Sequence, residues 1–141
     1  MLYYWDTSAI LSFIFKESLS PLVIQHVQKK NSLPGFTSFF SWIEVESAIY
    51  RRIYEKSLEP VFLTELRLKV QSIENSFNKV WPNHEMLDVS KHIISQYGLK
   101  PGDSLQLSSC LSLKKENCSF VCLDKKLNQV ARALALSVEF E

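Results

Sequence analysis

The chain has 141 residues, of which 46% are hydrophobic and 22% charged, and its 16 basic and 15 acidic side chains leave a formal charge of +1. This length and composition predict a single folded domain, residues 1–141, that is large enough to bury a core. The balanced charge neither indicates nor excludes a nucleic-acid partner, because any attraction to phosphate would have to be local.

The start of the chain lacks the features of a secretory signal or a membrane span. The apolar run of residues 9–15 is short, is interrupted by Ser12 and follows Asp6. We therefore expect a cytoplasmic protein with no membrane partner. The cysteines and histidines lack zinc-ligand spacing, and the cysteines are expected to be small core residues. They are Cys110, Cys118 and Cys122, and His26, His84 and His92.

Short apolar runs alternate with helical patterns along the whole chain. The predicted strands are residues 3–5, 36–37, 84–87, 119–123 and 138–140. The predicted helices are residues 9–15, 20–30, 38–56, 58–80, 88–97, 101–115 and 124–134, with a turn at 31–35. Asp88 is the expected N-cap of its helix, and Gly98 is the expected C-cap glycine. The alternation predicts an α/β fold with a mostly parallel sheet of about five strands that is covered by helices on both sides.

Two aspartates stand where a predicted buried strand gives way to a helix. Asp6 follows the strand at residues 3–5, and Asp124 follows the strand at residues 119–123. In an α/β sheet the chemistry takes place at the carboxyl ends of the strands, so these two carboxylates are expected to meet at one site. The alternative is that each only caps the helix that follows it.

Further carboxylates lie on two of the predicted helices. Asp103 falls in the first turn of its helix, where the dipole alone favours it, yet it shares a side with Leu107. On the helix of residues 38–56, periodicity places Glu46 among apolar residues and Glu44 on the side of Arg51. Either glutamate could instead be solvated surface or pair with a neighbouring arginine.

Several carboxylates at one place repel each other and need a compensating cation. Oxygen-only ligands favour Mg²⁺ or Mn²⁺, and such ions assist the hydrolysis of phosphate esters. The sequence has no nucleophile-elbow motif, and with only three glycines it has no glycine-rich phosphate loop. The pattern therefore favours a metal-dependent phosphoesterase.

Five blocks of the sequence, in order, resemble the PIN domain and in particular the VapC-type toxins of bacterial toxin–antitoxin pairs. They are Asp6-Thr7-Ser8-Ala9; Thr37-Ser38 with Glu44, Ala48-Ile49 and Arg51; Leu99 with Asp103-Ser104 and Leu107; Phe120 to Asp124 with Leu127 and Ala131; and Ser137-Val138. Each block is weak alone. Together they cover essentially the whole chain.

The resemblance implies a three-layer α/β/α fold and single-strand-specific cleavage of RNA by metal-activated water. It implies that Mg²⁺ or Mn²⁺ is held by Asp6, Glu44, Asp103 and Asp124. The family register selects Glu44, whereas helical periodicity draws attention to Glu46. Thr7 or Ser8 would support Asp6 by hydrogen bonding. This chain departs from the family pattern at Gly102, Ser104, Gln106 and Cys122, which affects the fine tuning of the site and removes no carboxylate.

RNA binding needs local positive charge. The candidates are Lys100, Lys125 and Lys126, which lie next to Asp103 and Asp124 in sequence, with Arg51 and Arg52 as further candidates. The aromatic run of residues 3–5 is expected to pack in the core and not to stack on bases. The resemblance also implies a homodimer and a cognate antitoxin protein as partner.

Other interpretations remain open from the sequence. A PIN-like binding module without activity would keep the fold and lose the chemistry. A haloacid-dehalogenase-like phosphatase would need a second aspartate two residues after Asp6, where this chain has Ser8. A DNA nuclease would use the same metal chemistry as a ribonuclease.

Overall fold

A five-stranded parallel sheet forms the centre of the protein in the computed structural model, which describes residues 2–15, 21–23, 25 and 35–140. The strands are β1 (Leu2–Trp5), β2 (Phe36–Ser38), β3 (Asn78–Val80), β4 (Cys118–Val121) and β5 (Ser137–Val138), and their order in the sheet is β3-β2-β1-β4-β5. All four pairings are parallel. The predicted α/β fold is therefore confirmed, and every strand ends at the same edge of the sheet.

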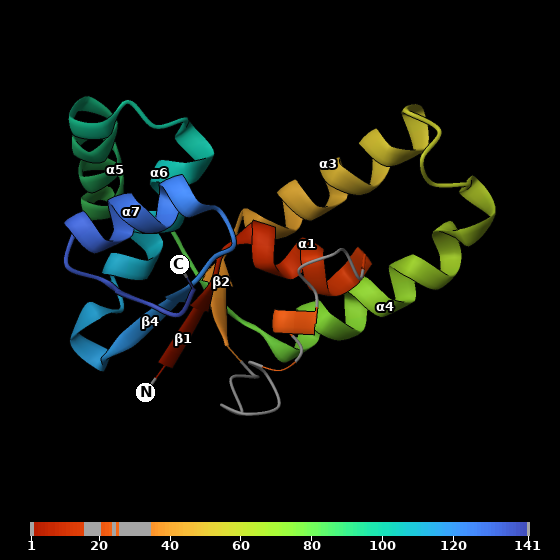
Figure 1. The fold of residues 1–141 in the computed structure, drawn as a ribbon, viewed down its shortest axis with the longest axis horizontal. Coiled ribbons are helices and arrows are strands. Elements are labelled where there is room, and N and C mark those ends of the chain that lie inside the picture. The colour runs from red at the N-terminus through yellow and green to blue at the C-terminus, as the bar shows by residue number, and fades with distance from the viewer. Residues whose placement is uncertain (1, 16–20, 24, 26–34, 141) are drawn as a thin grey trace.

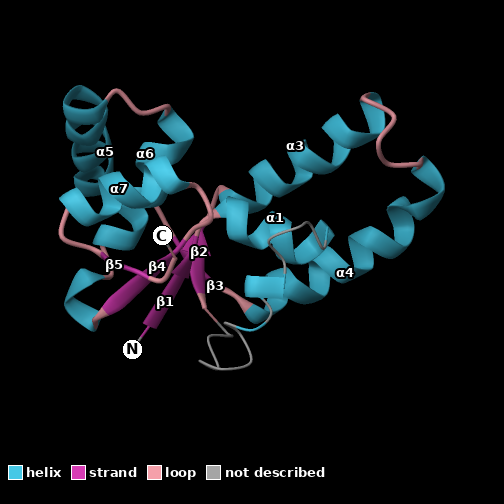
Figure 2. Cartoon of the chain, in the orientation of Figure 1, coloured by secondary structure: helices cyan, strands magenta, loops and turns pink. Residues whose placement is uncertain are grey.

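Helices cover the sheet on both sides (Figures 1 and 2). They are α1 (Thr7–Phe15), α3 (Ser41–Tyr54), α4 (Leu63–Ser76), α5 (His84–Tyr97), α6 (Pro101–Leu111) and α7 (Lys125–Ala133), with short 3₁₀ turns η1 (Pro60–Phe62) and η2 (Lys114–Glu116). In Figure 1, α5, α6 and α7 lie together on one side, while α1, α3 and α4 lie on the other. The pair α3 and α4 extends away from the sheet as an arm.

Alternate residues of β1 and β4 face opposite sides of the sheet and thereby build two hydrophobic cores. Tyr4 and Phe120 are fully buried beneath α5, α6 and α7, and their rings stack with centroids 6.0 Å apart. Trp5 and Val121 are buried on the other face against α1 and α3. The aromatic run of β1 thus belongs to the core, as predicted, and the cysteines are buried and free.

The region after α4 differs from the prediction. Residues 78–80 form the edge strand β3, whereas the sequence predicted a helix that continues to Val80. The error arises because Val70, Ile73 and Phe77 keep a helical spacing up to the last residue before the strand. Residues 84–87, predicted as a weak strand, are the first turn of α5.

The start of α5 also lies earlier than predicted. Asn83 is its N-cap, and its side-chain oxygen accepts a hydrogen bond of 2.8 Å from the Met86 N–H. The predicted cap, Asp88, lies inside the helix. Asparagine and aspartate cap equally well, so local sequence did not distinguish them. Gly98 ends the helix with φ 65°, as predicted.

Other boundaries shift by a few residues. Ser38 belongs to β2, and α3 begins at Ser41 and ends at Tyr54. Helix α6 ends at Leu111 and is followed by η2, whereas one helix was predicted to residue 115. The predicted helix at 20–30 and the turn at 31–35 fall mostly outside the described residues; residues 21–23 and 25 are helical.

The two candidate caps of α5 can be separated by mutation. Because Asn83 satisfies the Met86 N–H, Asn83→Ala is expected to lower the free energy of unfolding by ~1 kcal/mol. Asp88→Ala is the matched control and is expected to change it by less than about 0.5 kcal/mol. Urea denaturation followed by circular dichroism measures both. A larger loss in Asp88→Ala would contradict this assignment.

Candidate active site

Asp6 and Asp124 lie at the carboxyl ends of neighbouring central strands. Asp6 directly follows β1, and its backbone N–H donates a 2.9 Å hydrogen bond to the Val121 carbonyl at the end of β4. Asp124 is the N-cap of α7, and its side chain accepts a 3.1 Å hydrogen bond from the Leu127 N–H. The parallel pairing of β1 with β4 therefore brings both junctions to one place on the sheet edge.

The Asp6 carboxylate is buried, with 5% of the residue exposed. Its Oδ2 atom accepts hydrogen bonds from the Ser8 N–H (3.1 Å), the Ser8 hydroxyl (2.7 Å) and the Cys122 thiol (3.4 Å). Burial raises the pKa of Asp6 from 3.8 to about 6, with a smaller contribution from the charge of Glu44; the Ser8 and Cys122 hydrogen bonds oppose the rise. At neutral pH this buried anion is therefore short of compensating positive charge.

The Cys122 side chain lies between Asp6 and the backbone of Asp124. Its sulfur lies 3.4 Å from Asp6 Oδ2 and 3.3 Å from the Asp124 backbone nitrogen. Burial, followed by the nearby Asp6 charge, raises the pKa of the thiol well above its ordinary value, so it stays protonated and can donate to Asp6.

Glu44, in the first turn of α3, is held by a buried polar network. Its Oε1 atom accepts hydrogen bonds from the Thr7 hydroxyl at 2.7 Å and from the Gln106 amide at 3.0 Å. The Gln106 amide also donates to Thr7 at 2.7 Å and accepts 2.5 Å from the Tyr4 hydroxyl. Tyr4, Gln106 and Thr7 thus fix the position of one Glu44 oxygen.

The other Glu44 oxygen points at the beginning of α6. A Cβ atom on Gly102 would lie 3.1 Å from Glu44 Oε2, so the glycine gives the carboxylate room beside Asp103. From the sequence, Gln106 was only a departure from the family pattern and Tyr4 only a core residue. The available signal was that Gln106 lies one helical turn before Cys110, on the apolar side of its predicted helix, where an amide needs hydrogen-bond partners.

Asp103 lies in the first turn of α6 and is partly buried. Burial raises its pKa, and the charge of Asp124 raises it further, while Lys100 and Lys126 lower it. Asp103 and Asp124 therefore share a region of negative potential, and two of the predicted RNA-binding lysines lie close enough to act on it.

The remaining predicted residues lie as follows. Glu46 forms an ion pair with Arg67 of α4 on the arm, and therefore does not face the other carboxylates. Ser8 donates to Asp6, whereas Thr7 donates to Glu44. Lys125 is exposed in the first turn of α7, and Arg51 is exposed in the last turn of α3, about two turns from Glu44.

The donor set fits a hard divalent cation in chemistry and in charge. Burial is the main cause of the raised pKa values of Asp6 and Asp103, and the charges of Glu44 and Asp124, respectively, raise them further, so each pair brings two carboxylates close together in a place shielded from water. In the described part of the chain, no three His, Cys, Asp or Glu side chains are gathered tightly enough to enclose a metal ion.

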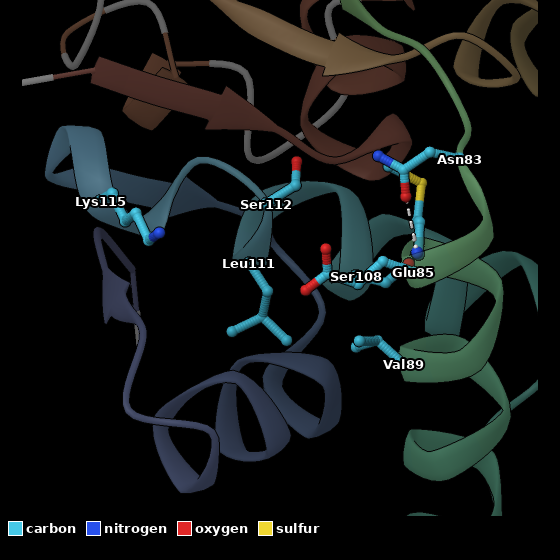
Figure 3. A pocket seen from close by; sticks show the side chains of 8 residues that line it. Asn83, Glu85, Val89, Ser108, Leu111, Ser112 and Lys115 are labelled. Carbon is cyan, nitrogen blue, oxygen red and sulfur yellow. Dashed lines mark hydrogen bonds between the residues drawn. The ribbon is translucent and has the colours of Figure 1, made fainter.

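A separate hollow of about 280 Å³ lies between α5 and α6 and is lined by Asn83, Glu85, Met86, Val89, Ser108, Leu111, Ser112 and Lys115 (Figure 3). It adjoins the C-terminal end of α6, whereas Asp103 lies at the N-terminal end. Its serines are bonded internally: Ser108 pairs with Ser90 at 2.7 Å, and Ser112 donates to the Ser109 carbonyl at 2.6 Å. The hollow is therefore not part of the acidic site.

These features define an α/β protein with an acidic site at the carboxyl edge of a parallel sheet. The sequence model of the PIN domain matches residues 3–133. The chain belongs to the PIN domain family. No curated protein matches it at a significant level of sequence similarity.

Two solved structures share the fold over nearly the whole chain. The chain is similar to a component of VapBC2 from Rickettsia felis bound to a promoter DNA fragment, with a TM-score of 0.69, 16% identity, and coverage of 99% of this chain and 98% of that chain. It is also similar to a component of VapBC-1 from nontypeable Haemophilus influenzae, with a TM-score of 0.61, 19% identity and the same coverage of 99% and 98%. In the described part of the chain, every helix is too short or too polar to cross a membrane.

The burial of Asp6 predicts a pH-dependent stability in metal-free buffer. The pKa of Asp6 in the folded state, about 6, exceeds its ordinary value of 3.8, so ionisation of Asp6 opposes folding. Below about pH 4 the Asp6 side chain is protonated in the folded protein and the wild type keeps its full stability. This contribution to stability is lost as the pH rises through 6 and the buried side chain ionises. Asp6→Asn is therefore expected to be more stable than the wild type by about 3 kcal/mol at pH 7.5 and nearly equal at pH 4.

Denaturant unfolding in EDTA at both pH values measures this difference. Added Mg²⁺ is expected to raise the melting temperature of the wild type and not that of Asp6→Asn, because a bound cation offsets the buried charge. A difference in stability that does not vary with pH would contradict the assignment.

Proposed function

We propose that this PIN-domain protein is a metal-dependent endoribonuclease, the VapC-type toxin of a toxin–antitoxin pair. The observation that carries the proposal is that two pairs of neighbouring carboxylates, Asp6 with Glu44 and Asp103 with Asp124, lie past the carboxyl edge of the sheet in a chain whose family is known for nucleases. The VapBC neighbours, which share the fold, support the VapC type.

In this proposal the metal ligands are Asp6, Glu44, Asp103 and Asp124. A bound Mg²⁺ or Mn²⁺ supplies neutralisation of phosphoryl charge and lowers the pKa of water. The chain itself holds the carboxylates in place. Ser8 and Cys122 fix Asp6 Oδ2, and this leaves Oδ1 for a further ligand. The amide of Gln106 fixes Glu44 Oε1 and leaves Oε2 directed toward α6.

The lysines beside the site are proposed to bind the RNA backbone. Lys100 and Lys126 already act electrostatically on Asp103, so a phosphate drawn to them comes close to the carboxylates. Lys125 in the first turn of α7 and Arg51 in the last turn of α3 are exposed and are the further candidates for contacts with the RNA backbone. Because the net charge of the chain is only +1, attraction to RNA has to come from local groups of basic residues.

The proposed protein partners are a cognate antitoxin and a second copy of the chain, in the cytoplasm. Support comes from the VapBC assemblies of the two neighbours and from large apolar side chains exposed on the arm. They include Ile43 of α3, Leu68 of α4, and Val61 and Phe62 of the connecting turn η1. Large apolar side chains left exposed together are typical of an interface with another protein.

Cleavage of RNA by the purified, antitoxin-free protein tests the proposal. We expect endonucleolytic products with Mg²⁺ or Mn²⁺ and none with EDTA. Glu44→Gln is expected to lower the rate by about 100-fold or more, because it removes a charge that binds the metal. Glu46→Gln is the matched control on the same helix and is expected to keep wild-type activity, because Glu46 pairs with Arg67.

The alternative outcomes are distinct. Equal products from Glu44→Gln would mean a contaminating nuclease or a wrong site. Cleavage of DNA and not of RNA would identify a DNA nuclease. Intact RNA in the presence of a folded, metal-bound protein would favour a PIN-like binding module without activity.

A further inference from the structure

Three aromatic side chains form a continuous surface just past the carboxyl ends of β2 and β3. Phe39 and Phe40 follow β2, and Trp81 follows β3. The rings of Phe39 and Trp81 stack at 6.2 Å with an interplanar angle of 20°, and Phe40 meets Phe39 edge-on at 5.7 Å. We call these three residues the aromatic platform.

The platform is not needed for the hydrophobic core. Trp81 is 66% exposed, whereas Trp5 is 1% and Trp42 is 9% exposed. In the described part of the chain, neither core includes a platform ring. The Phe39 N–H donates a 3.0 Å hydrogen bond to the Val80 carbonyl, which fixes the two loops to each other. A large indole is thus held in a defined orientation while most of its surface faces solvent.

The platform borders the acidic site. Strand β2 lies beside β1 and β3 lies beside β2, all parallel, so the three carboxyl ends share the edge that carries Asp6. The Phe40 ring lies 3.8 Å and Glu44 Oε2 lies 3.1 Å from the position of a Cβ atom on Gly102. The Phe40 ring of the platform and the Glu44 carboxylate therefore both lie beside Gly102 in the first turn of α6.

We propose that the aromatic platform binds an unpaired base of a single-stranded nucleic acid whose backbone lies over the carboxylates. The proposal deepens the proposed function and rests on it for the identity of the substrate. Stacking on aromatic rings beside a basic surface is how proteins bind single strands without regard to sequence. Lys100 and Lys126 supply that charge next to Asp103. Bases inside a duplex already stack on their neighbours, so this surface selects single strands.

Binding of a fluorescently labelled 12-nucleotide RNA, measured by anisotropy, tests the proposal. The protein is the full chain carrying Glu44→Gln, with Mg²⁺ present, so that the RNA stays intact. In this background Trp81→Ala is expected to raise the Kd by about 5- to 100-fold, the range for loss of one stacked base. Trp81→Tyr is expected to restore most of the affinity, because it restores a ring.

Tyr54→Ala is the matched control. Tyr54 is an 83% exposed aromatic residue at the far end of α3, and its removal is expected to leave the Kd unchanged. Circular dichroism of each variant confirms that it is folded. Since Trp81 is exposed, its replacement is expected to have little effect on stability.

An oligonucleotide with one abasic position separates base stacking from other contacts. When that position is moved along the RNA, we expect the protein that keeps Trp81 to bind more weakly at one or two positions. In the Trp81→Ala protein, the abasic position is expected to cause no further loss of affinity. Additive losses would mean that Trp81 does not contact the base and would overturn the proposal.

Two further results would overturn it. One is an unchanged Kd in Trp81→Ala. The other is loss of dimerisation or antitoxin binding in Trp81→Ala with RNA binding intact, which would identify the platform as a protein interface. These results are distinguishable from failure of the proposed function. A protein that binds RNA through Trp81 without cleaving it contradicts only the nuclease, and a protein that cleaves with a platform-independent Kd contradicts only the platform.

Discussion

The parallel pairing of β1 with β4 is the constraint on which the site depends. The pairing runs from Leu2 opposite Cys118 to Trp5 opposite Val121, and it ends with the hydrogen bond from the Asp6 N–H to the Val121 carbonyl. Because all strands run in the same direction, the chain must leave the sheet at one edge after each of them. The carboxylates after β1 and β4 and the rings after β2 and β3 consequently share that edge. One pattern of strand pairing thus places both the proposed chemistry and the proposed base contact.

Burying the negatively charged Asp6 carboxylate at this site costs free energy, and hydrogen bonds from neighbouring residues offset part of that cost. Ser8 and Cys122 stabilise the Asp6 carboxylate, yet burial still raises its pKa to about 6. Glu44 depends on the network of Tyr4, Gln106 and Thr7, whose members are all buried. Buried polar networks are rigid when every partner is satisfied. The scaffold therefore holds the two carboxylate pairs in place, and the proposed cation would relieve the repulsion between their charges.

Much of this arrangement was predictable from the sequence, for identifiable reasons. The apolar runs of β1 and β4 and the Gly98 cap are local signals, and the convergence of Asp6 with Asp124 follows from parallel topology. Strand β3 was missed because it is only three residues long and follows a helical spacing without interruption. The partners of Glu44 were missed for a different reason: Tyr4, Thr7 and Gln106 come from β1, α1 and α6, and only the folded chain brings them together. The same holds for the stacking of Trp81 on Phe39, which joins two loops.

The central claim is that Asp6, Glu44, Asp103 and Asp124 together form a divalent-metal site. Anomalous diffraction from crystals of the antitoxin-free protein soaked in Mn²⁺ tests this claim most directly, because it locates the ion independently of activity. We expect the anomalous peak between the two pairs, in contact with Asp6 and with Asp103 or Asp124. A well-ordered sheet edge that holds no manganese at saturating concentration, or a peak only elsewhere on the protein, would contradict the claim.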